Sequence, residues 1–231
     1  MSWHDLRARP WPAFAVVAAL EAGVAAWAPW PVAAVLGWFA LGTGWVAIAY
    51  LLRRPEWLGK HRARVAAAVA LYPFLALAKA SARAARTRVG TAPIEVAPGL
   101  FVGGWPEGTA TEWAQLDLTA ELPRRGPARA YACFPMLDGD VPPEPAYRAA
   151  VDQALAWRRA GLPVLVHCAY GHGRSVAVAI GVMVAEGLAE DWTDAHRAVL
   201  ALRPRARMTV LQREFVARVT PTLRTRAMVS A

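Results

Sequence analysis

The sequence predicts an α/β domain, a central β-sheet flanked by helices, that follows an apolar helical region at the N-terminus. From about residue 91, short apolar runs alternate with segments of helical periodicity, which is typical of layered α/β proteins. Before that point, long stretches carry almost no charge. We therefore divide the chain into a membrane-anchoring region, residues 1–90, and a folded domain, residues 91–231.

Two apolar runs near the N-terminus predict a transmembrane helical hairpin. Residues 13–29 contain one charge, Glu21, and residues 31–52 contain none. The second run has 22 residues, which matches the length a helix needs to cross the hydrocarbon core. Pro29 and Pro31 favour a tight turn at the membrane interface between the two spans. Glu21 is costly in lipid, so it is expected either to face the partner helix or to be protonated.

A cleaved signal peptide is the competing interpretation of the first run. The run lacks a clear small-residue cleavage site, and a longer apolar run follows at once, so the hairpin is favoured. Basic residues on both sides of the hairpin place both of its ends in the cytoplasm. These residues are Arg7, Arg9, Arg53, Arg54, Lys60, Arg62 and Arg64. The expected location is the inner (cytoplasmic) membrane, with the C-terminal domain facing the cytoplasm.

A third apolar stretch, residues 65–82, is interrupted by Pro73 and Lys79 and has arginines on both sides. Positive charge at both ends favours a segment that lies in the membrane interface. A third span, the alternative, would place the C-terminal domain on the outside.

The C-terminal domain begins with strands. Extended pieces are predicted within residues 94–106, a strand near 114–118, and another over 128–137 that leads into the loop DGDVPPEP. A helix is predicted over 144–160, and a Val-rich buried strand over 162–168.

Helices fill the rest of the domain. One begins at Arg174 and is stopped by Gly187. The next is capped by Asp191 or Thr193 and ends near Pro204, and Thr209 is expected to cap a last helix that reaches about residue 226.

Charge and cysteine content narrow the possible partners. The net charge is +9, and only Lys60 and Lys79 among the 26 basic residues are lysines. A basic chain suits nucleic acid, an anionic membrane surface or a phosphorylated substrate, but no nucleic-acid-binding motif is present, and the apolar N-terminus favours the membrane.

Two cysteines make no disulfide framework, and Cys133 is interpreted as a small core residue. If Cys133 lay near Cys168, the two could form a protective disulfide.

The stretch VLVHCAYGHGRSVAVAIGVMVAE, residues 164–186, carries the main functional signal. Cys168 lies at the carboxyl end of a buried strand, the sheet edge where α/β proteins bind ligands. Gly171 and Gly173 allow a tight turn that points backbone N–H groups inward. A helix begins at Arg174, so its N-terminal dipole also faces the loop. The segment therefore predicts a cavity for an oxyanion, above all phosphate.

The residue types in this loop suit nucleophilic chemistry at phosphorus. The field that attracts phosphate also stabilises the thiolate of Cys168. Arg174 can bind two phosphate oxygens through its planar guanidinium, and Ser175 can donate a hydrogen bond to the sulfur. His167 is expected to orient the loop.

Two other interpretations of the loop fail. An ATP-binding P-loop needs Gly-Lys-Ser/Thr where this chain has Gly-Arg-Ser. A zinc site at His167, Cys168 and His172 lacks a fourth ligand at useful spacing.

The run from His167 to Ser175 resembles the HCx5R[ST] signature of cysteine-dependent protein tyrosine and dual-specificity phosphatases. The resemblance spans roughly residues 94–220 and leaves the hairpin outside. It implies a dual-specificity-phosphatase-like sheet, a phosphocysteine intermediate, and neither metal nor cofactor. The phosphate-binding residues would be Ala169, Tyr170, Gly171, His172, Gly173 and Arg174.

The family also uses an aspartic acid on a separate loop as general acid. Asp138 follows the strand-like run 128–137 directly and is favoured, with Asp140 as the alternative.

The resemblance implies a phosphoric monoester hydrolase that acts on phosphorylated proteins. A phospholipid or phosphoinositide phosphatase similar to phosphatidylglycerophosphatases is the second possibility, although Ala169 stands where such loops usually carry Lys or Arg, and His172 is only a partial replacement. A third is a phospho-binding membrane protein without catalysis.

Overall fold

The computed structural model describes residues 10–58, 65–106 and 112–229. The chain forms two compact units, and each is described by itself. The first comprises residues 1–81 with 120–123, and the second residues 82–119 with 124–231. Several basic residues behind the predicted membrane orientation lie outside the described residues, namely Arg7, Arg9, Lys60, Arg62 and Arg64.

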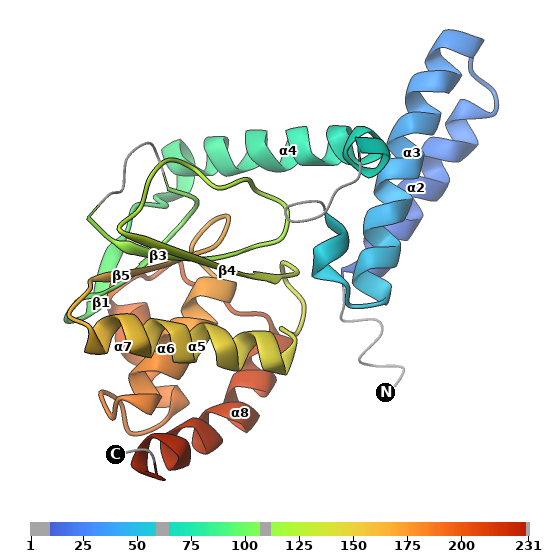
Figure 1. Cartoon of the computed structure of the whole chain (residues 1–231). Helices are drawn as coiled ribbons and strands as arrows, with labels where there is room; N and C mark the ends of the chain where they lie inside the picture. The colour runs from blue at the N-terminus through green and yellow to red at the C-terminus, as the bar shows by residue number, and fades with distance from the viewer. Residues whose placement is uncertain (1–9, 59–64, 107–111, 230–231) are drawn as a thin grey trace. The chain divides into compact units, whose positions relative to one another are not determined.

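The first unit contains a helical hairpin of α2 (Trp11–Ala25) and α3 (Trp30–Leu51), which lie side by side (Figure 1). Pro29 is extended at the N-cap of α3, with ψ of 147°, and a proline within the first helical turn suits its start. A Cβ on Gly44 would lie 3.9 Å from Ala18 Cβ, so small residues let the two helices approach. The short 3₁₀ helix η1 (Pro55–Leu58) follows α3.

The two apolar helices differ in length from the predicted spans. Among the described residues, α3 is the one helix long and apolar enough to cross a membrane. The run predicted over 13–29 ends at Ala25 as a helix of 15 residues, about 22 Å long, which is shorter than a hydrocarbon core.

Helix α4 (Val65–Val89) runs through Pro73, the proline within the third apolar stretch of the sequence. A proline inside a helix removes one backbone donor, which leaves the carbonyl four residues earlier without its usual partner. Here that carbonyl belongs to Val69, and it accepts a hydrogen bond of 2.8 Å from Trp38 Nε1 on α3. The helix therefore continues past Pro73 because a tryptophan from another helix replaces the missing donor.

The second unit is built on a mixed sheet of five strands. They are β1 (Ile94–Ala97), β2 (Leu100–Gly103), β3 (Ala114–Thr119), β4 (Ala130–Met136) and β5 (Val164–His167), in the order β1-β2-β5-β3-β4. Only β1 and β2 pair antiparallel, and the other pairs are parallel. The central strand β5 is buried at all four positions, as its run of apolar residues predicts.

Four helices complete this unit and lie on one side of the sheet in Figure 1. They are α5 (Glu144–Arg159), α6 (Arg174–Ala185), α7 (Trp192–Leu202) and α8 (Val210–Val229). Asp191 caps α7 by accepting hydrogen bonds from two backbone N–H groups, which decides between Asp191 and Thr193. Thr209 and Gln212 form a reciprocal capping box at the start of α8.

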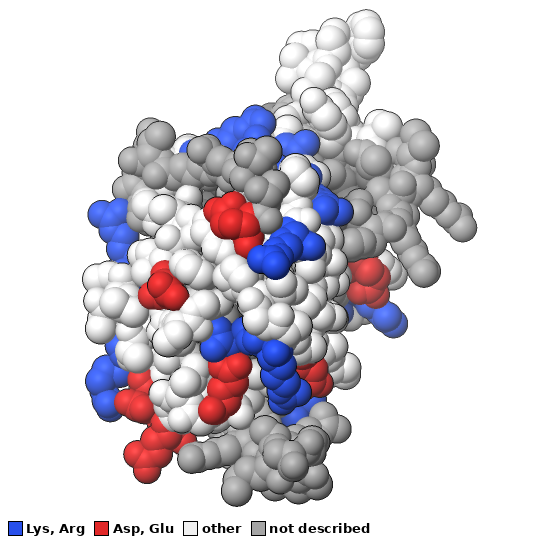
Figure 2. Space-filling model, turned by 60° about the vertical axis from the view of Figure 1, so that its left-hand side comes forward, with Lys and Arg blue, Asp and Glu red and all other residues white. Residues whose placement is uncertain are grey.

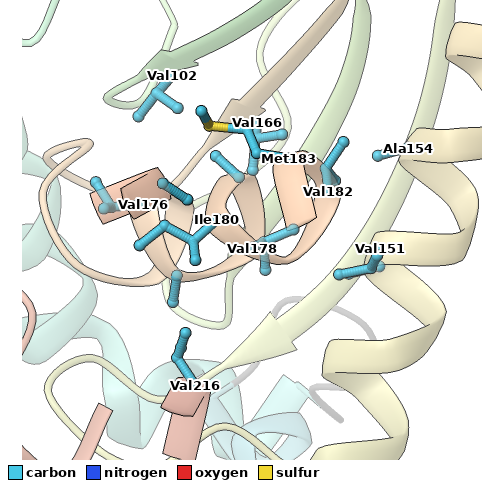
Figure 3. Close-up of a cluster of buried hydrophobic side chains, with 14 of the residues drawn as sticks. Val102, Val151, Ala154, Val166, Val176, Val178, Ile180, Val182, Met183 and Val216 are labelled. Carbon is cyan, nitrogen blue, oxygen red and sulfur yellow. The ribbon is translucent and has the colours of Figure 1, made fainter. Parts of the chain in front are cut away.

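Helix α6 packs into the hydrophobic core and fixes the direction of its own N-terminus. Val176, Val178, Ile180 and Val182 are buried between the sheet and the neighbouring helices (Figure 3). Because α6 is held on all sides, the residues at its first turn are held with it.

Tyr147 joins α5 to α6 through a hydrogen bond. Its hydroxyl donates a hydrogen bond of 3.0 Å to the Ala177 carbonyl, and a Cβ on Gly181 would collide with that hydroxyl. The glycine therefore allows a close contact between the two helices.

Candidate active site

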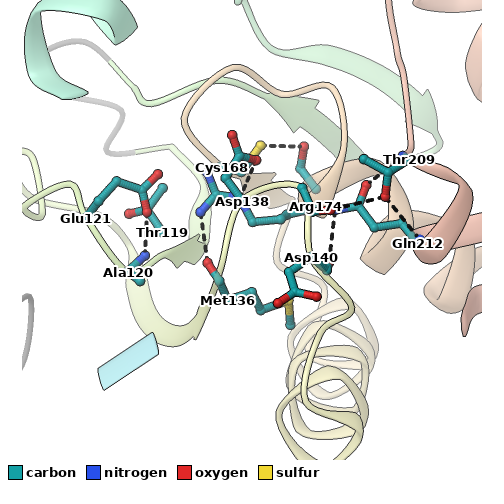
Figure 4. Close-up of polar contacts among 12 residues, drawn as sticks. Thr119, Ala120, Glu121, Met136, Asp138, Asp140, Cys168, Arg174, Thr209 and Gln212 are labelled. Carbon is teal, nitrogen blue, oxygen red and sulfur yellow. Dashed lines mark hydrogen bonds and ion pairs between the residues drawn. The ribbon is translucent and has the colours of Figure 1, made fainter. Parts of the chain in front are cut away.

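The site lies at the carboxyl edge of the parallel strands, where the segments after β4 and β5 meet. Strand β5 ends at His167, and α6 begins at Arg174. The loop between them, residues 168–173, and the loop that follows β4, residues 137–143, contact each other through Arg174 (Figure 4). The sequence places the predicted nucleophile and the predicted acid on these two loops.

The 168–173 loop turns its carbonyl oxygens outward. Ala169 O accepts a hydrogen bond from Trp105 N at 3.1 Å, Tyr170 O from Arg203 Nη2 at 3.2 Å, and His172 O from Arg207 N at 2.8 Å. Carbonyls bound on the outside leave the concave side of such a turn to N–H groups, which is the arrangement that binds anions.

Gly171 is required by this turn. Its φ is +74°, a conformation that favours glycine, and a Cβ there would lie 2.5 Å from the Gly103 carbonyl carbon and 2.7 Å from Arg203 Nη2. The loop is therefore pressed against the end of β2 and against a buried arginine.

The Cys168 side chain is buried, with 2% exposure, and its sulfur lies among hydrogen-bond donors. Gly171 N donates to the Cys168 sulfur at 3.2 Å, and the Ser175 hydroxyl lies 3.4 Å from it.

The Arg174 guanidinium connects the two loops. Its Nη1 donates to the Met136 carbonyl at 2.9 Å, and its Nε forms an ion pair with Asp138 Oδ1 at 3.2 Å (Figure 4). Arg174 is buried, so its direction is fixed by these contacts and by its place at the start of α6.

The two candidate acids occupy different environments. The Asp138 side chain is 46% exposed and contacts Arg174, and Figure 4 shows it beside Cys168. Asp140 is 1% exposed, and its carboxylate accepts a hydrogen bond of 2.8 Å from Val141 N. The geometry therefore brings Asp138 to the predicted nucleophile and gives Asp140 a local structural contact.

A buried network that the sequence did not reveal lies behind His167. His167 Nδ1 is 3.9 Å from Asp117 Oδ1, and both side chains are buried. Asp117 also accepts hydrogen bonds from the Thr119 hydroxyl at 2.8 Å and the Tyr131 hydroxyl at 2.9 Å. Burial, followed by the Asp117 charge, raises the pKa of Tyr131, so its hydroxyl remains a donor. These contacts orient His167 from strands β3 and β4.

Arg203 is a second residue that sequence patterns missed. Its Nη1 donates to the Ala92 carbonyl at 2.9 Å, while its Nη2 holds Tyr170 O. Burial lowers the pKa of Arg203, and the nearby Cys168 opposes that shift. A Leu-Arg-Pro sequence at the end of a helix gives no sign of this, because the partners lie 33 and 111 residues away.

Comparisons with solved structures identify the fold of the second unit. A mouse putative dual specificity phosphatase in complex with zinc tungstate is 23% identical, with a TM-score of 0.51, over 61% of this chain and 97% of that one. Human DUSP28 is 20% identical, with a TM-score of 0.50, over 57% and 94%. DUSP15 is 18% identical, with a TM-score of 0.50, over 62% and 98%. The chain has a dual-specificity-phosphatase-like fold. No protein-family model and no curated protein matches the chain.

Two remaining predictions concern cysteine and metal. Asp117 of β3 pairs with Cys133 on one side and with His167 on the other. Cys133 is therefore two strand spacings from His167, about 10 Å, which does not favour a disulfide with Cys168. Within residues 10–58, 65–106 and 112–229, no three His, Cys, Asp or Glu side chains form a group that could hold a metal ion.

Proposed function

We propose that the protein is a membrane-anchored, cysteine-dependent phosphatase that hydrolyses phosphomonoesters through a phosphocysteine intermediate. The observation that carries this proposal is the convergence at one sheet edge of Cys168, Arg174 and Asp138, around a loop whose carbonyls are bound on the outside. The fold alone supports no activity, because unrelated functions share folds.

The first chemical step would transfer the phosphoryl group to sulfur. The Cys168 thiolate attacks phosphorus in line, and the sulfur–phosphorus bond forms as the bond to the leaving oxygen breaks. The amides of the 168–173 loop and the Arg174 guanidinium stabilise the equatorial oxygens. Asp138 donates its proton to the leaving oxygen.

The second step would release phosphate. A water molecule gives its proton to the Asp138 carboxylate and attacks phosphorus. The sulfur–phosphorus bond breaks, inorganic phosphate leaves, and the thiolate forms again with a hydrogen bond from Ser175, whose hydroxyl is 3.4 Å from the sulfur. The same Asp138 carboxyl then carries a proton for the next cycle.

Phosphate binding would also compete with the ion pair seen here. Arg174 Nε lies 3.2 Å from Asp138 Oδ1, and a bound dianion would take over part of that guanidinium. The carboxyl would then be released toward the leaving oxygen.

The test is phosphate release from p-nitrophenyl phosphate by the purified full-length chain and by Cys168→Ser. We expect the serine variant to lose turnover completely, because its hydroxyl is not ionised at neutral pH, and to retain phosphate binding. Unchanged turnover in Cys168→Ser would exclude the cysteine mechanism. Phosphate binding without turnover in the unmodified chain would instead support the phospho-binding protein.

Membrane anchoring is part of the same proposal and rests on α3. This helix is apolar over its whole length and has exposed side chains such as Leu41, which is 71% exposed. Trp27 and Trp30 are highly exposed at the turn before it, the position where interfacial tryptophans are common. Figure 2 shows no charged side chain on the projecting end of the hairpin.

A lipid phosphatase is the second candidate, and the same helix favours it. A domain tethered to a bilayer meets lipid phosphates at high local concentration, whereas a phosphoprotein substrate needs no tether. Initial rates on a phosphotyrosine peptide and on phosphatidylglycerophosphate in micelles separate the two candidates. A higher kcat/KM on the peptide would favour the protein phosphatase.

A further inference from the structure

Residues 90–92, which follow the end of α4 and lead to β1, are fastened to the domain at every position. We call this segment the strap. Its middle residue, Thr91, is buried, with 7% exposure. Each of the three backbone carbonyls of the strap accepts a hydrogen bond from a residue distant in the chain. The donors connect the strap to the 168–173 loop by two routes.

The first route passes through the buried side chain of Arg203. Its Nη2 donates to Gly90 O at 3.4 Å and to Tyr170 O at 3.2 Å, and its Nη1 donates to Ala92 O at 2.9 Å. A guanidinium can hold several carbonyls at once because its N–H groups point in fixed directions within one plane. One side chain therefore joins both ends of the strap to the loop.

The second route passes through the two residues that follow the core of β2. Gly104 N donates to Thr91 O at 2.8 Å, and Trp105 N donates to Ala169 O at 3.1 Å. A Cβ on Gly104 would lie 2.6 Å from Thr91 Cβ and 3.1 Å from Ala169 O, so the strap and the loop both approach this glycine closely. The two routes end at neighbouring carbonyls of the loop, those of Ala169 and Tyr170.

We propose that the strap and Arg203 position the 168–173 loop, so that the affinity of the loop for phosphate depends on the segment through which α4 joins the sheet. The inference rests on the proposed function in taking this loop as the phosphate site. In a trans peptide, a carbonyl and the N–H of the next residue point in opposite directions, so a carbonyl held outward keeps that N–H inward. A displaced strap would release these carbonyls, and the amides would no longer converge on one oxyanion.

The experiment measures the dissociation constant of inorganic phosphate for the purified full-length chain and for Gly90→Val, by isothermal titration calorimetry. Gly90 has a φ of +69°, which a β-branched residue strongly disfavours, and a Cβ there would meet no atom within 4 Å. Valine should therefore displace the strap without creating a collision. We expect the dissociation constant to rise about fivefold, the effect of one lost hydrogen bond. The KM for p-nitrophenyl phosphate should rise with it.

Gly161→Val is the matched control. Gly161 lies just after α5, as Gly90 lies just after α4, its φ is +72°, and a Cβ there would also meet no atom within 4 Å. It leads into the amino end of β5, at the edge of the sheet opposite the loop. Both variants should lose similar thermal stability, and only Gly90→Val should bind phosphate more weakly. Equal weakening in both would overturn the inference, because general destabilisation would then explain the effect.

Alanine at the same two positions imposes a milder strain and repeats the comparison should a valine variant fail to fold. Arg203→Lys tests the first route, because an ammonium group keeps the charge but cannot hold the strap and Tyr170 O together. It should weaken phosphate binding, and Gly90→Val should add little in its presence, since either change breaks the same connection. Fully multiplicative effects in the double variant would show that the strap does not act through Arg203.

The remaining outcomes separate the inference from the proposed function. Unchanged phosphate binding in Gly90→Val overturns the positioning role and leaves the phosphatase standing. Neither phosphate binding nor turnover in the unmodified chain overturns both. Phosphate binding without turnover overturns the phosphatase alone, and the pair of glycine variants then still decides the inference.

Discussion

At the scale of single residues, Asp138 and Asp140 differ in surroundings although they are two positions apart. Asp138 is half-exposed and paired with Arg174, whereas Asp140 is buried and bonded to the backbone of the next residue. A group that exchanges protons with a substrate must reach it, which Asp138 can do and Asp140 cannot without rearranging its loop.

We expect Asp138→Asn to lower kcat by about 10²- to 10⁴-fold, the usual contribution of a general acid. The loss should be larger with an alkyl phosphate than with p-nitrophenyl phosphate, because nitrophenolate leaves without much protonation. Asp140→Asn is the control, and it should change kcat less than about tenfold while lowering thermal stability. Steady-state kinetics on both substrates measure this, and a larger effect at Asp140 would reverse the assignment.

The sequence alone predicts the candidate catalytic residues, but it does not predict the buried residues that hold them in place. Cys168, Arg174 and Ser175 are close in sequence, and Asp138 directly follows a strand, so local patterns reveal them. Arg203 and Asp117 act through partners that are distant in the chain. Only the folded topology brings these partners together.

At the scale of elements, the contact between α5 and α6 depends on Gly181. A Cβ there would collide with the Tyr147 hydroxyl and lie 2.9 Å from Val151 Cγ2. Helix propensity alone predicts that Gly181→Ala stabilises α6, whereas the steric collision predicts that it destabilises the protein. In a closely packed core, the collision should have the larger effect.

We expect Gly181→Ala to destabilise the protein by about 1–3 kcal/mol in urea unfolding, as overpacking usually does. Tyr147→Phe removes the hydroxyl and should cost about 1 kcal/mol for its lost hydrogen bond. The double variant should be more stable than the sum of the two predicts, because the hydroxyl is part of the collision. Simple additivity would show that the two sites do not interact.

The cap of α8 offers a second test. Thr209→Ala breaks the reciprocal bonds with Gln212 and should cost about 0.5–2 kcal/mol. Thr209→Ser keeps the hydroxyl and should retain most of the stability. Thermal unfolding of the two variants gives the comparison, and equal losses would mean that the methyl group rather than the cap is responsible.

Element boundaries were predicted best where a clear start or stop signal exists. The helix expected from Arg174 to Gly187 is observed as Arg174–Ala185, and the strand expected over 162–168 as Val164–His167. The sequence did not show how a helix continues through Pro73, because the donor that replaces the missing one comes from another helix. That donor, Trp38, lies 31 residues before the Val69 carbonyl it contacts.

At the scale of the whole molecule, the α/β class is confirmed, with its mixed sheet and flanking helices. The strand order β1-β2-β5-β3-β4 could not be read from the chain, because the central strand is the last one in sequence. Apolar runs identify which strands are buried, but they do not say which strands are neighbours.

Membrane association is the prediction that belongs to this scale. We expect the full-length chain to remain in the membrane pellet after alkaline carbonate extraction. Leu41→Arg places a charge at the middle of α3, where insertion costs about 2.5–3.5 kcal/mol, and should shift part of the protein to the supernatant. Leu41→Phe is the control and should stay in the pellet. Complete extraction of the unmodified chain would argue against a spanning α3.

The hydrogen bond from Trp38 to Val69 has a consequence for any shortened version of the protein. Removing the N-terminal hairpin to obtain a shorter fragment would also remove Trp38, whose indole N–H donates to the Val69 carbonyl in α4. The remaining helix would lose this hydrogen bond one turn before Pro73 and would leave the Val69 carbonyl to solvent. An investigator who trims the N-terminus should therefore expect damage beyond the cut.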